Sequence, residues 1–164
     1  MTVYTIGYEG LDLDRFIKLL KRFHVGELVD VRERAQSRKK GFSKTALGEA
    51  LAEGGMEYSH VPSLGCPKPV RDQYKKDGDW GKYTKGFLAH LKTQGDALDM
   101  LSDKASESTC ALLCFEADFN YCHRSMVAEA IQSATGDMIE HIMKDAIKTV
   151  KIAPKAQLAV ASGR

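Results

Sequence analysis

Short apolar runs alternate with amphipathic stretches along most of this chain. Each run has the length of a β-strand, and the stretches between the runs repeat their apolar residues at helical spacing. This alternation is typical of parallel strands joined by crossover helices. Five strands are predicted, at residues 3–6, 27–32, 56–61, 109–115 and 138–142. The run at 109–115 is apolar throughout, which predicts a central strand covered on both faces.

Capping residues mark the ends of several predicted helices. Asp12 is expected to cap the first helix, which carries its apolar residues on one face. Ser43 is expected to cap the second helix, and the pair Gly54-Gly55 to end it. Another helix is expected to start at Ser125, shortly after the central strand.

Residues 62–83 show no clear period. They hold three of the four prolines and the only tryptophan, Trp80, and are expected to form a long loop with one short helix at most. Such loops are uncommon in compact domains, so the segment is either functional, for example a lid, or irregular packing around Trp80. Helical spacing returns at residues 84–103, where Gly95 interrupts it; one bent helix or two short helices fit this pattern.

The length of 164 residues fits one domain. We predict a single α/β domain over residues 1–143 with a mostly parallel sheet of about five strands, and a basic, partly helical tail over residues 144–164. The tail carries five Lys or Arg and one Asp, which leaves the body at −2 and without the broad basic field of many nucleic-acid binders. Two local basic clusters, at 32–44 and 68–85, are either solvated loops or binding sites.

The composition is that of an ordinary soluble globular protein, with 43% apolar and 28% charged residues. A run of about 18 apolar residues, as a membrane span requires, is absent, and the chain does not open like a signal peptide. We therefore expect a cytoplasmic protein without a membrane partner. The four cysteines, Cys66, Cys110, Cys114 and Cys122, are expected to be thiols in a reducing compartment.

Reactive and ionisable side chains crowd the step from the central strand to the next helix. The segment contains Glu116, Cys122, His123, Arg124 and Ser125. Ligands of open parallel sheets bind beyond the carboxyl ends of the strands, where helix N-termini attract anions. Arg124 and Ser125 would add a guanidinium and a hydroxyl to such a cradle, so a phosphate or a carboxylate is the expected occupant.

If the first, second and central strands are adjacent, further polar residues emerge at this same edge. They are Tyr8, Asp30 and Arg32. Two carboxylates near a histidine can divide general acid and general base roles, so Glu116, His123 and Asp30 are the predicted catalytic residues. The alternative is structural: Glu116 or Asp30 pairs with an arginine and holds the loops.

The two cysteines of this segment allow other interpretations. Cys114, Cys122 and His123 could bind zinc, but their spacing lacks the paired short intervals of structural zinc sites, so neither a metal nor a cofactor is expected. Cys122 lies beside a helix N-terminus and an arginine, which favours a nucleophilic thiolate. Residues 120–130 superficially resemble the phosphate-binding loop of low-molecular-weight tyrosine phosphatases, but no cysteine lies five residues before Arg124. Cys114 is then expected to be a core residue.

Several motifs taken together resemble one family, the domain-of-unknown-function family 488. They are T-I-G-Y-E-G at 5–10, L-V-D-V-R at 28–32, S-R-K-K-G-F at 37–42, S-L-G at 63–65, and C-F-E with C-H-R-S within 114–125. The resemblance spans about residues 3–143 and implies a Rossmann-like three-layer α/β sandwich of mostly prokaryotic, cytosolic proteins, with no settled activity. The family's charged signature falls on Asp30, Arg32, Ser37, Arg38, Glu116, Cys122, His123 and Arg124. Ala35 and Cys66 depart from it, because proline and glycine are usual there.

These observations favour a protein that binds a phosphate-bearing ligand, either a nucleotide or a nucleic acid, at the carboxyl edge of the sheet. An enzyme that acts on this ligand is one form of the hypothesis. The predicted ligand-binding residues are Tyr8, Arg32, Ser37, Arg38, Cys122, Arg124 and Ser125. One alternative is a non-catalytic nucleic-acid-binding module that uses the basic loop at 32–44. The other is a structural Arg–Glu–His network in a protein that serves an unknown protein partner. The sequence gives neither a reaction nor an oligomeric state.

Overall fold

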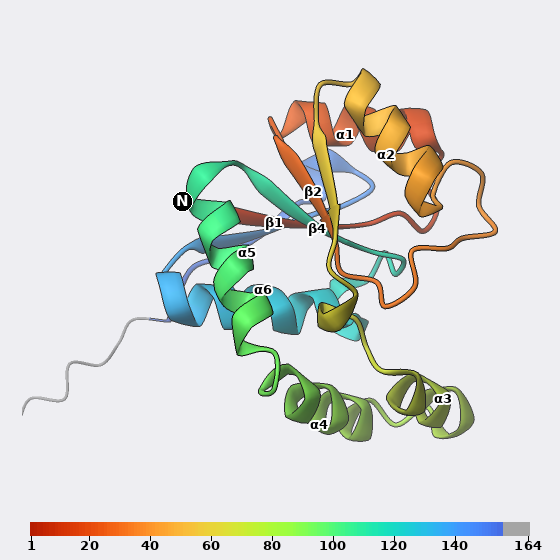
Figure 1. The fold of residues 1–164 in the computed structure, drawn as a ribbon, viewed down its shortest axis with the longest axis vertical. Coiled ribbons are helices and arrows are strands. Elements are labelled where there is room, and N and C mark those ends of the chain that lie inside the picture. The colour runs from red at the N-terminus through yellow and green to blue at the C-terminus, as the bar shows by residue number, and fades with distance from the viewer. Residues whose placement is uncertain (156–164) are drawn as a thin grey trace, which may run out of the picture.

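The computed structural model describes residues 1–155 and contains one six-stranded sheet with helices on both faces (Figure 1). The strands are β1 (Thr2–Gly7), β2 (Glu27–Asp30), β3 (Glu57–His60), β4 (Cys110–Cys114), β5 (Met138–Ile142) and β6 (Val150–Ile152). Their order is β3-β2-β4-β1-β5-β6, and every neighbouring pair is parallel except the antiparallel pair of β5 and β6. The predicted Rossmann-like α/β sandwich is confirmed, with one strand more than expected.

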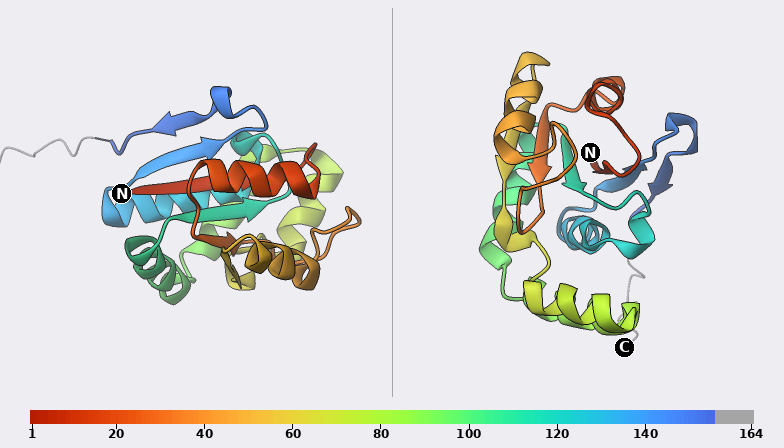
Figure 2. Two further views of the ribbon diagram at one scale, coloured as in Figure 1. Left: turned by 90° about the horizontal axis from the view of Figure 1, so that it is seen from above. Right: turned by 90° about the vertical axis from the view of Figure 1, so that its right-hand side faces the viewer.

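Within the described residues, six α-helices accompany the sheet. They are α1 (Leu13–Arg22), α2 (Lys44–Glu53), α3 (Lys68–Asp77), α4 (Trp80–Leu91), α5 (Gly95–Glu107) and α6 (His123–Thr135), with 3-10 turns η1 (Pro62–Leu64), η2 (Phe119–Tyr121) and η3 (Ala146–Lys148). Helices α1 and α2 cover one face of the sheet, and α5 and α6 the other. Helices α3 and α4 form a hairpin beyond α6, on the side away from α1 (Figure 2).

The central strand β4 contributes to two hydrophobic cores, one on each face of the sheet. It lies between β2 and β1, and all five of its residues are buried, as its apolar run predicts. Because side chains alternate along a strand, Cys110 and Leu112 enter the core under α5 and α6, whereas Ala111 and Leu113 enter the core under α1 and α2. With β1, β2 and β4 adjacent, their carboxyl ends meet at one edge, as the sequence interpretation requires.

The predicted helix starts hold in part. Asp12 caps α1, and its carboxylate accepts a hydrogen bond from the backbone N–H of Arg15 at 2.8 Å. Ser43 occupies the N-cap position of α2, but its hydroxyl donates to the carbonyl of Ser37 instead of capping the helix. Helix α6 begins at His123, two residues before the predicted start, with Cys122 as its N-cap residue.

The prediction of a long loop over residues 62–83 is wrong. Those residues form η1, the ten-residue helix α3 and the start of α4. All three prolines precede Val70, and the last of them, Pro69, lies in the first turn of α3, where a missing N–H costs nothing. Gly78 ends α3 in the left-handed conformation at φ 62°, and Asp79 then caps α4.

Two further expectations are refined. Residues 84–103 belong to two helices, which separate just before Gly95. The predicted basic tail is not chiefly helical within the described residues, because it forms only η3 before β6 joins the sheet edge; its last part, residues 156–164, lies outside them. Among residues 1–155, no helix is both long and apolar enough to cross a membrane.

Gly7, the last residue of β1, gives a stability prediction. A Cβ atom there would lie 1.8 Å from the backbone oxygen of Glu116, so Gly7→Ala forces two chain segments apart and should lower the free energy of unfolding by about 3 kcal/mol. Gly95→Ala is the matched control, since a Cβ there meets nothing within 4 Å. Urea denaturation measures both, and equal effects of the two substitutions would refute the close approach.

Candidate active site

A pocket of about 470 Å³ opens at the carboxyl ends of β1, β2 and β4. The α3–α4 hairpin forms its opposite wall. Its aromatic lining consists of Tyr8, Tyr74, Trp80, Tyr83, Phe115 and Tyr121. Its charged lining consists of Arg32, Glu33, Arg34, Arg71, Lys75 and Glu116. Cys66, Cys114 and His123 also line it, so strand ends and the α6 start contribute to one concave site.

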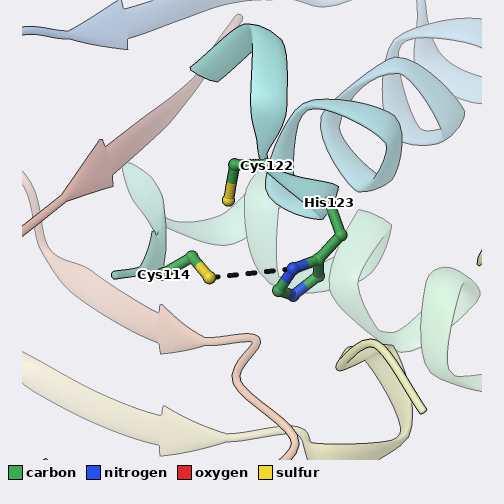
Figure 3. A group of neighbouring side chains, drawn as sticks. All are labelled: Cys114, Cys122 and His123. Atoms are coloured by element: carbon green, nitrogen blue, oxygen red, sulfur yellow. Dashed lines mark hydrogen bonds between the residues drawn. The ribbon is translucent and has the colours of Figure 1, made fainter. Parts of the chain in front are cut away.

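Two thiols and an imidazole meet at the floor of this pocket, and we call Cys114, Cys122 and His123 the thiol–imidazole cluster (Figure 3). Their sulfur atoms and one ring nitrogen all lie within 4.8 Å of one another. Cys114 Sγ lies 3.7 Å from His123 Nδ1. All three side chains are buried, with at most 5% of each residue exposed. The cluster joins the end of β4 to the start of α6.

Glu116 extends the cluster toward the pocket. Its Oε2 atom accepts hydrogen bonds from the thiols of Cys114 at 3.1 Å and Cys122 at 3.3 Å. Burial, and then the negative charge of Cys122, raise the pKa of the Glu116 carboxyl. This carboxyl is therefore easier to protonate than one in water.

The two thiols differ in acidity. Hydrogen bonding to Cys122 and burial raise the pKa of Cys114. Burial also opposes ionisation of Cys122, but hydrogen bonds from Cys114 and His123 and the charges of His123 and Arg124 outweigh it, so the pKa of Cys122 lies well below its usual range. Cys122 is thus the more acidic of the two thiols.

The orientation of His123 is fixed by the backbone. Its Nε2 atom lies 2.7 Å from the carbonyl oxygen of Val31, and because a carbonyl only accepts, Nε2 carries a hydrogen. Nδ1 is then the atom that exchanges a proton with the thiols. Burial lowers the pKa of His123, but hydrogen bonding to Cys122 and its charge outweigh burial, so the net pKa is raised. The ring also packs edge-on against Phe87 at 5.2 Å.

Arg124 points away from the pocket. Its residue is fully buried, and its guanidinium donates to Thr5 Oγ1 at 3.2 Å, to the carbonyl of Glu116, and to the carbonyl of Ala117 at 3.3 Å. Ser125 likewise donates its hydroxyl to the carbonyl of Phe119. The two residues that the sequence nominates for an anion cradle thus bind the protein's own backbone. Arg124 fastens the loop after β4 to β1.

Buried hydrogen bonds connect Arg124 through Thr5 to His141. Thr5 Oγ1 accepts from Arg124, which leaves its hydroxyl hydrogen to donate to His141 Nδ1 at 2.6 Å. The His141 ring stacks on Phe119 with 3.9 Å between ring centroids. Burial, and then the charge of Arg124, lower the pKa of His141 to about 4. His141 is therefore neutral at physiological pH.

Asp30 and Arg32 form a closed ion pair beside the pocket. Two guanidinium nitrogens of Arg32 donate to the two carboxylate oxygens of Asp30, at 2.8 and 2.7 Å, and Tyr58 donates to the same carboxylate at 2.6 Å. Asp30 is fully buried, so no oxygen of it reaches the pocket. Arg32 does line the pocket and donates to the hydroxyl of Tyr8 at 3.2 Å.

Ser37 and Arg38 lie outside the pocket. Ser37 accepts a hydrogen bond from the backbone of Lys39 and bonds through its own backbone to Ser43, while Arg38 is exposed. Of the predicted set, Tyr8, Arg32, Glu116 and His123 thus line the pocket, and Cys122 lies behind it in the thiol–imidazole cluster.

Sequence reasoning missed the pocket wall on the α3–α4 hairpin. Tyr74 and Lys75 lie three and four residues after Arg71, so all three share one face of α3. This spacing lies within the basic cluster 68–85, but a helical face was not predicted there because a loop was expected.

The lowered pKa of His141 predicts how stability depends on pH. In the unfolded state His141 takes up a proton near the ordinary histidine pKa of about 6.5, whereas in the native state it does so only near pH 4. The free energy of unfolding should therefore decrease as the pH is lowered from about 6.5 to about 4, by about 3 kcal/mol in all. His141→Asn should remove this part of the loss, whereas His24→Asn, at an exposed position with φ 54°, should not. Urea titrations at pH 7, 5.5 and 4 compare the three proteins. Parallel losses in all three would contradict this assignment.

Comparison with known proteins gives one match. No curated protein and no solved structure matches the chain. The family model described as "Domain of unknown function DUF488" matches residues 12–131, a span that holds the thiol–imidazole cluster, the α3–α4 hairpin and the whole pocket lining except Tyr8. Since this match covers well over half of the 164 residues, the chain belongs to the DUF488 family.

Proposed function

We propose that the protein binds a phosphate-bearing ligand with a flat ring, a nucleotide or the end of a single nucleic-acid strand, in the pocket between the strand ends and the α3–α4 hairpin. The observation that carries the proposal is that one pocket combines available cations with an aromatic wall. Glu116 and His123, at the floor, are the residues best placed to act on such a ligand.

The cations of the pocket fall into two groups. Arg32 is held by Asp30, and Arg71 is held by Glu33 at 2.6 Å. Within residues 1–155, the side chains of Arg34 and Lys75 make no hydrogen bond or ion pair, and both are exposed. Free cations beside rigidly held guanidinium groups suit a phosphate, because the rigid groups orient the anion and the free ones neutralise it.

The aromatic wall is arranged for stacking. Trp80 and Tyr83 are stacked at 4.5 Å with 15° between their planes, and Tyr74 and Tyr121 meet Trp80 edge-on. Phe115 stands at the other side of the pocket with 43% of its surface exposed. Every nucleobase offers a flat face to such rings, so stacking binds bases without regard to sequence.

The size of the pocket favours a small ligand. Its volume of about 470 Å³ lies in the usual range of small-molecule sites. His123 is only 5% exposed, so a rigid duplex cannot reach the cluster, whereas a single nucleotide can. This supports the nucleotide interpretation over a module that grips the backbone of a duplex.

Calorimetric titration with nucleoside monophosphates and a short single-stranded oligonucleotide tests the proposal. Binding is expected for the nucleotides and should weaken as salt increases, because phosphate contacts are screened. Trp80→Leu should weaken binding at least about fivefold, since stacking contributes about 1–3 kcal/mol per base. Arg34→Ala should weaken it about threefold at low salt.

Arg38→Ala is the matched control, because Arg38 is an exposed cation of the same basic loop but does not line the pocket. The affinity of the Arg38→Ala variant for the nucleotides should equal that of the wild type. If Arg38→Ala weakens binding as much as Arg34→Ala, or if only duplex DNA binds, the nucleotide pocket is the wrong interpretation. The absence of any binding to the wild type rejects it outright.

A further inference from the structure

We propose that Cys114, Cys122 and His123 bind a divalent metal ion with affinity for sulfur, Zn²⁺ in the first place, and that Glu116 is the candidate fourth ligand. The proposal rests on the thiol–imidazole cluster alone and does not depend on nucleotide binding. It departs from the sequence interpretation, which set zinc aside because the spacing lacks paired short intervals.

The ligand atoms are close to the separation that zinc requires. Zn–S bonds of about 2.3 Å and Zn–N bonds of about 2.05 Å place neighbouring tetrahedral ligand atoms roughly 3.5–3.8 Å apart. Cys114 Sγ and His123 Nδ1 are 3.7 Å apart, and all three ligand atoms lie within 4.8 Å. Small side-chain rotations are sufficient to close the site around an ion.

The hydrogen bond of His123 to Val31 is the arrangement found behind metal-bound histidines. A ligating imidazole almost always donates its other N–H to a carboxylate or a backbone carbonyl, which fixes the tautomer. Here Nε2 donates to the carbonyl of Val31 at 2.7 Å, so Nδ1 faces the two sulfurs (Figure 3). The imidazole is already oriented as a ligand.

Cys122 supports the same interpretation from its place in α6. It is the N-cap residue, yet its side chain makes no capping hydrogen bond. Its sulfur instead turns toward Cys114 and His123 (Figure 3). The sulfur therefore serves the cluster and not the helix.

Charge balance agrees with a metal. Arg124 is fully buried, and among residues 1–155 no carboxylate forms an ion pair with it. Buried charges are stable only when they are compensated. A Zn²⁺ ion with two thiolates and the Glu116 carboxylate carries one negative charge, which the guanidinium of Arg124 balances. Glu116 Oε2, near both sulfurs, is on the pocket side, so the fourth position would face the pocket.

Two soft thiolates and an imidazole select zinc and related ions over Mg²⁺ or Ca²⁺. The test is an anaerobic titration of the reduced, metal-free protein with Co²⁺, followed by displacement with Zn²⁺. We expect one equivalent to bind, with the near-ultraviolet absorption of thiolate-to-cobalt charge transfer. Zinc should also raise the Tm of the wild type.

Cys114→Ala and Cys122→Ala should each remove most of that absorption and lower the affinity for zinc at least about 100-fold. Even the loss of a residue that only hydrogen-bonds to a metal ligand lowers metal affinity by about 10–100-fold, so the loss of a ligand itself should cost at least as much. Cys110→Ala is the matched control, because Cys110 is a buried thiol of the same strand that lies outside the cluster. It should bind like the wild type. Circular dichroism checks that each variant is folded.

The wild type alone can overturn the proposal, whatever the variants do. If the reduced protein shows no charge-transfer absorption, the cluster is a set of hydrogen-bonded thiols and not a metal site. Absorption that persists in both cluster variants places the metal elsewhere. Neither result affects the nucleotide titrations, so the two proposals fail separately.

Discussion

The buried guanidinium of Arg124 is the constraint on which this site depends. Its donors reach the carbonyls of Glu116 and Ala117 and the hydroxyl of Thr5, so one side chain of α6 fastens the loop after β4 to the neighbouring strand β1. Three donors of a guanidinium lie in a fixed plane, which lysine could not reproduce. Without this fastening, two inward-facing carbonyls would lose their partners, and the positions of Glu116 and Cys122 would no longer be set.

Close packing acts together with this hydrogen bonding. Gly7 lets β1 pass against the carbonyl of Glu116, the same oxygen that accepts from Arg124. The thiol–imidazole cluster is therefore held from one side by the loop and from the other by the hydrogen bond of His123 to Val31, the residue that follows β2. The cluster thus has a fixed position, because the adjacent strands β2, β4 and β1 hold the segments that carry it.

Much of this fold could be predicted from the sequence, because the determining signals are local. The apolar run of β4 marks a central strand, Asp12 marks the start of α1, and alternation of elements brings the carboxyl ends of the strands together. The number of prolines in residues 62–83 does not predict α3, because Pro69 lies in the first turn of that helix. Position within an element decides the effect of proline.

The site was less predictable than the fold, because side-chain direction is a tertiary property. Arg124 and Ser125 have the chemistry of an anion cradle, yet their donors turn toward the protein's own carbonyls. Asp30 emerges at the correct edge, but Arg32 and Tyr58 occupy its oxygens. The aromatic wall comes from the α3–α4 hairpin, which folds back over strand ends distant in sequence. No spacing rule contains that information.

The central proposal is that function resides in the pocket between the strand ends and the α3–α4 hairpin. A crystal structure of the reduced protein grown with a nucleoside monophosphate tests it most directly. Ligand density is expected in this pocket, with the ring against Trp80 and the phosphate near Arg34 and Lys75. Density in the basic groove between α1 and η3, lined by Arg15 and Lys148, with none in the pocket, would contradict it.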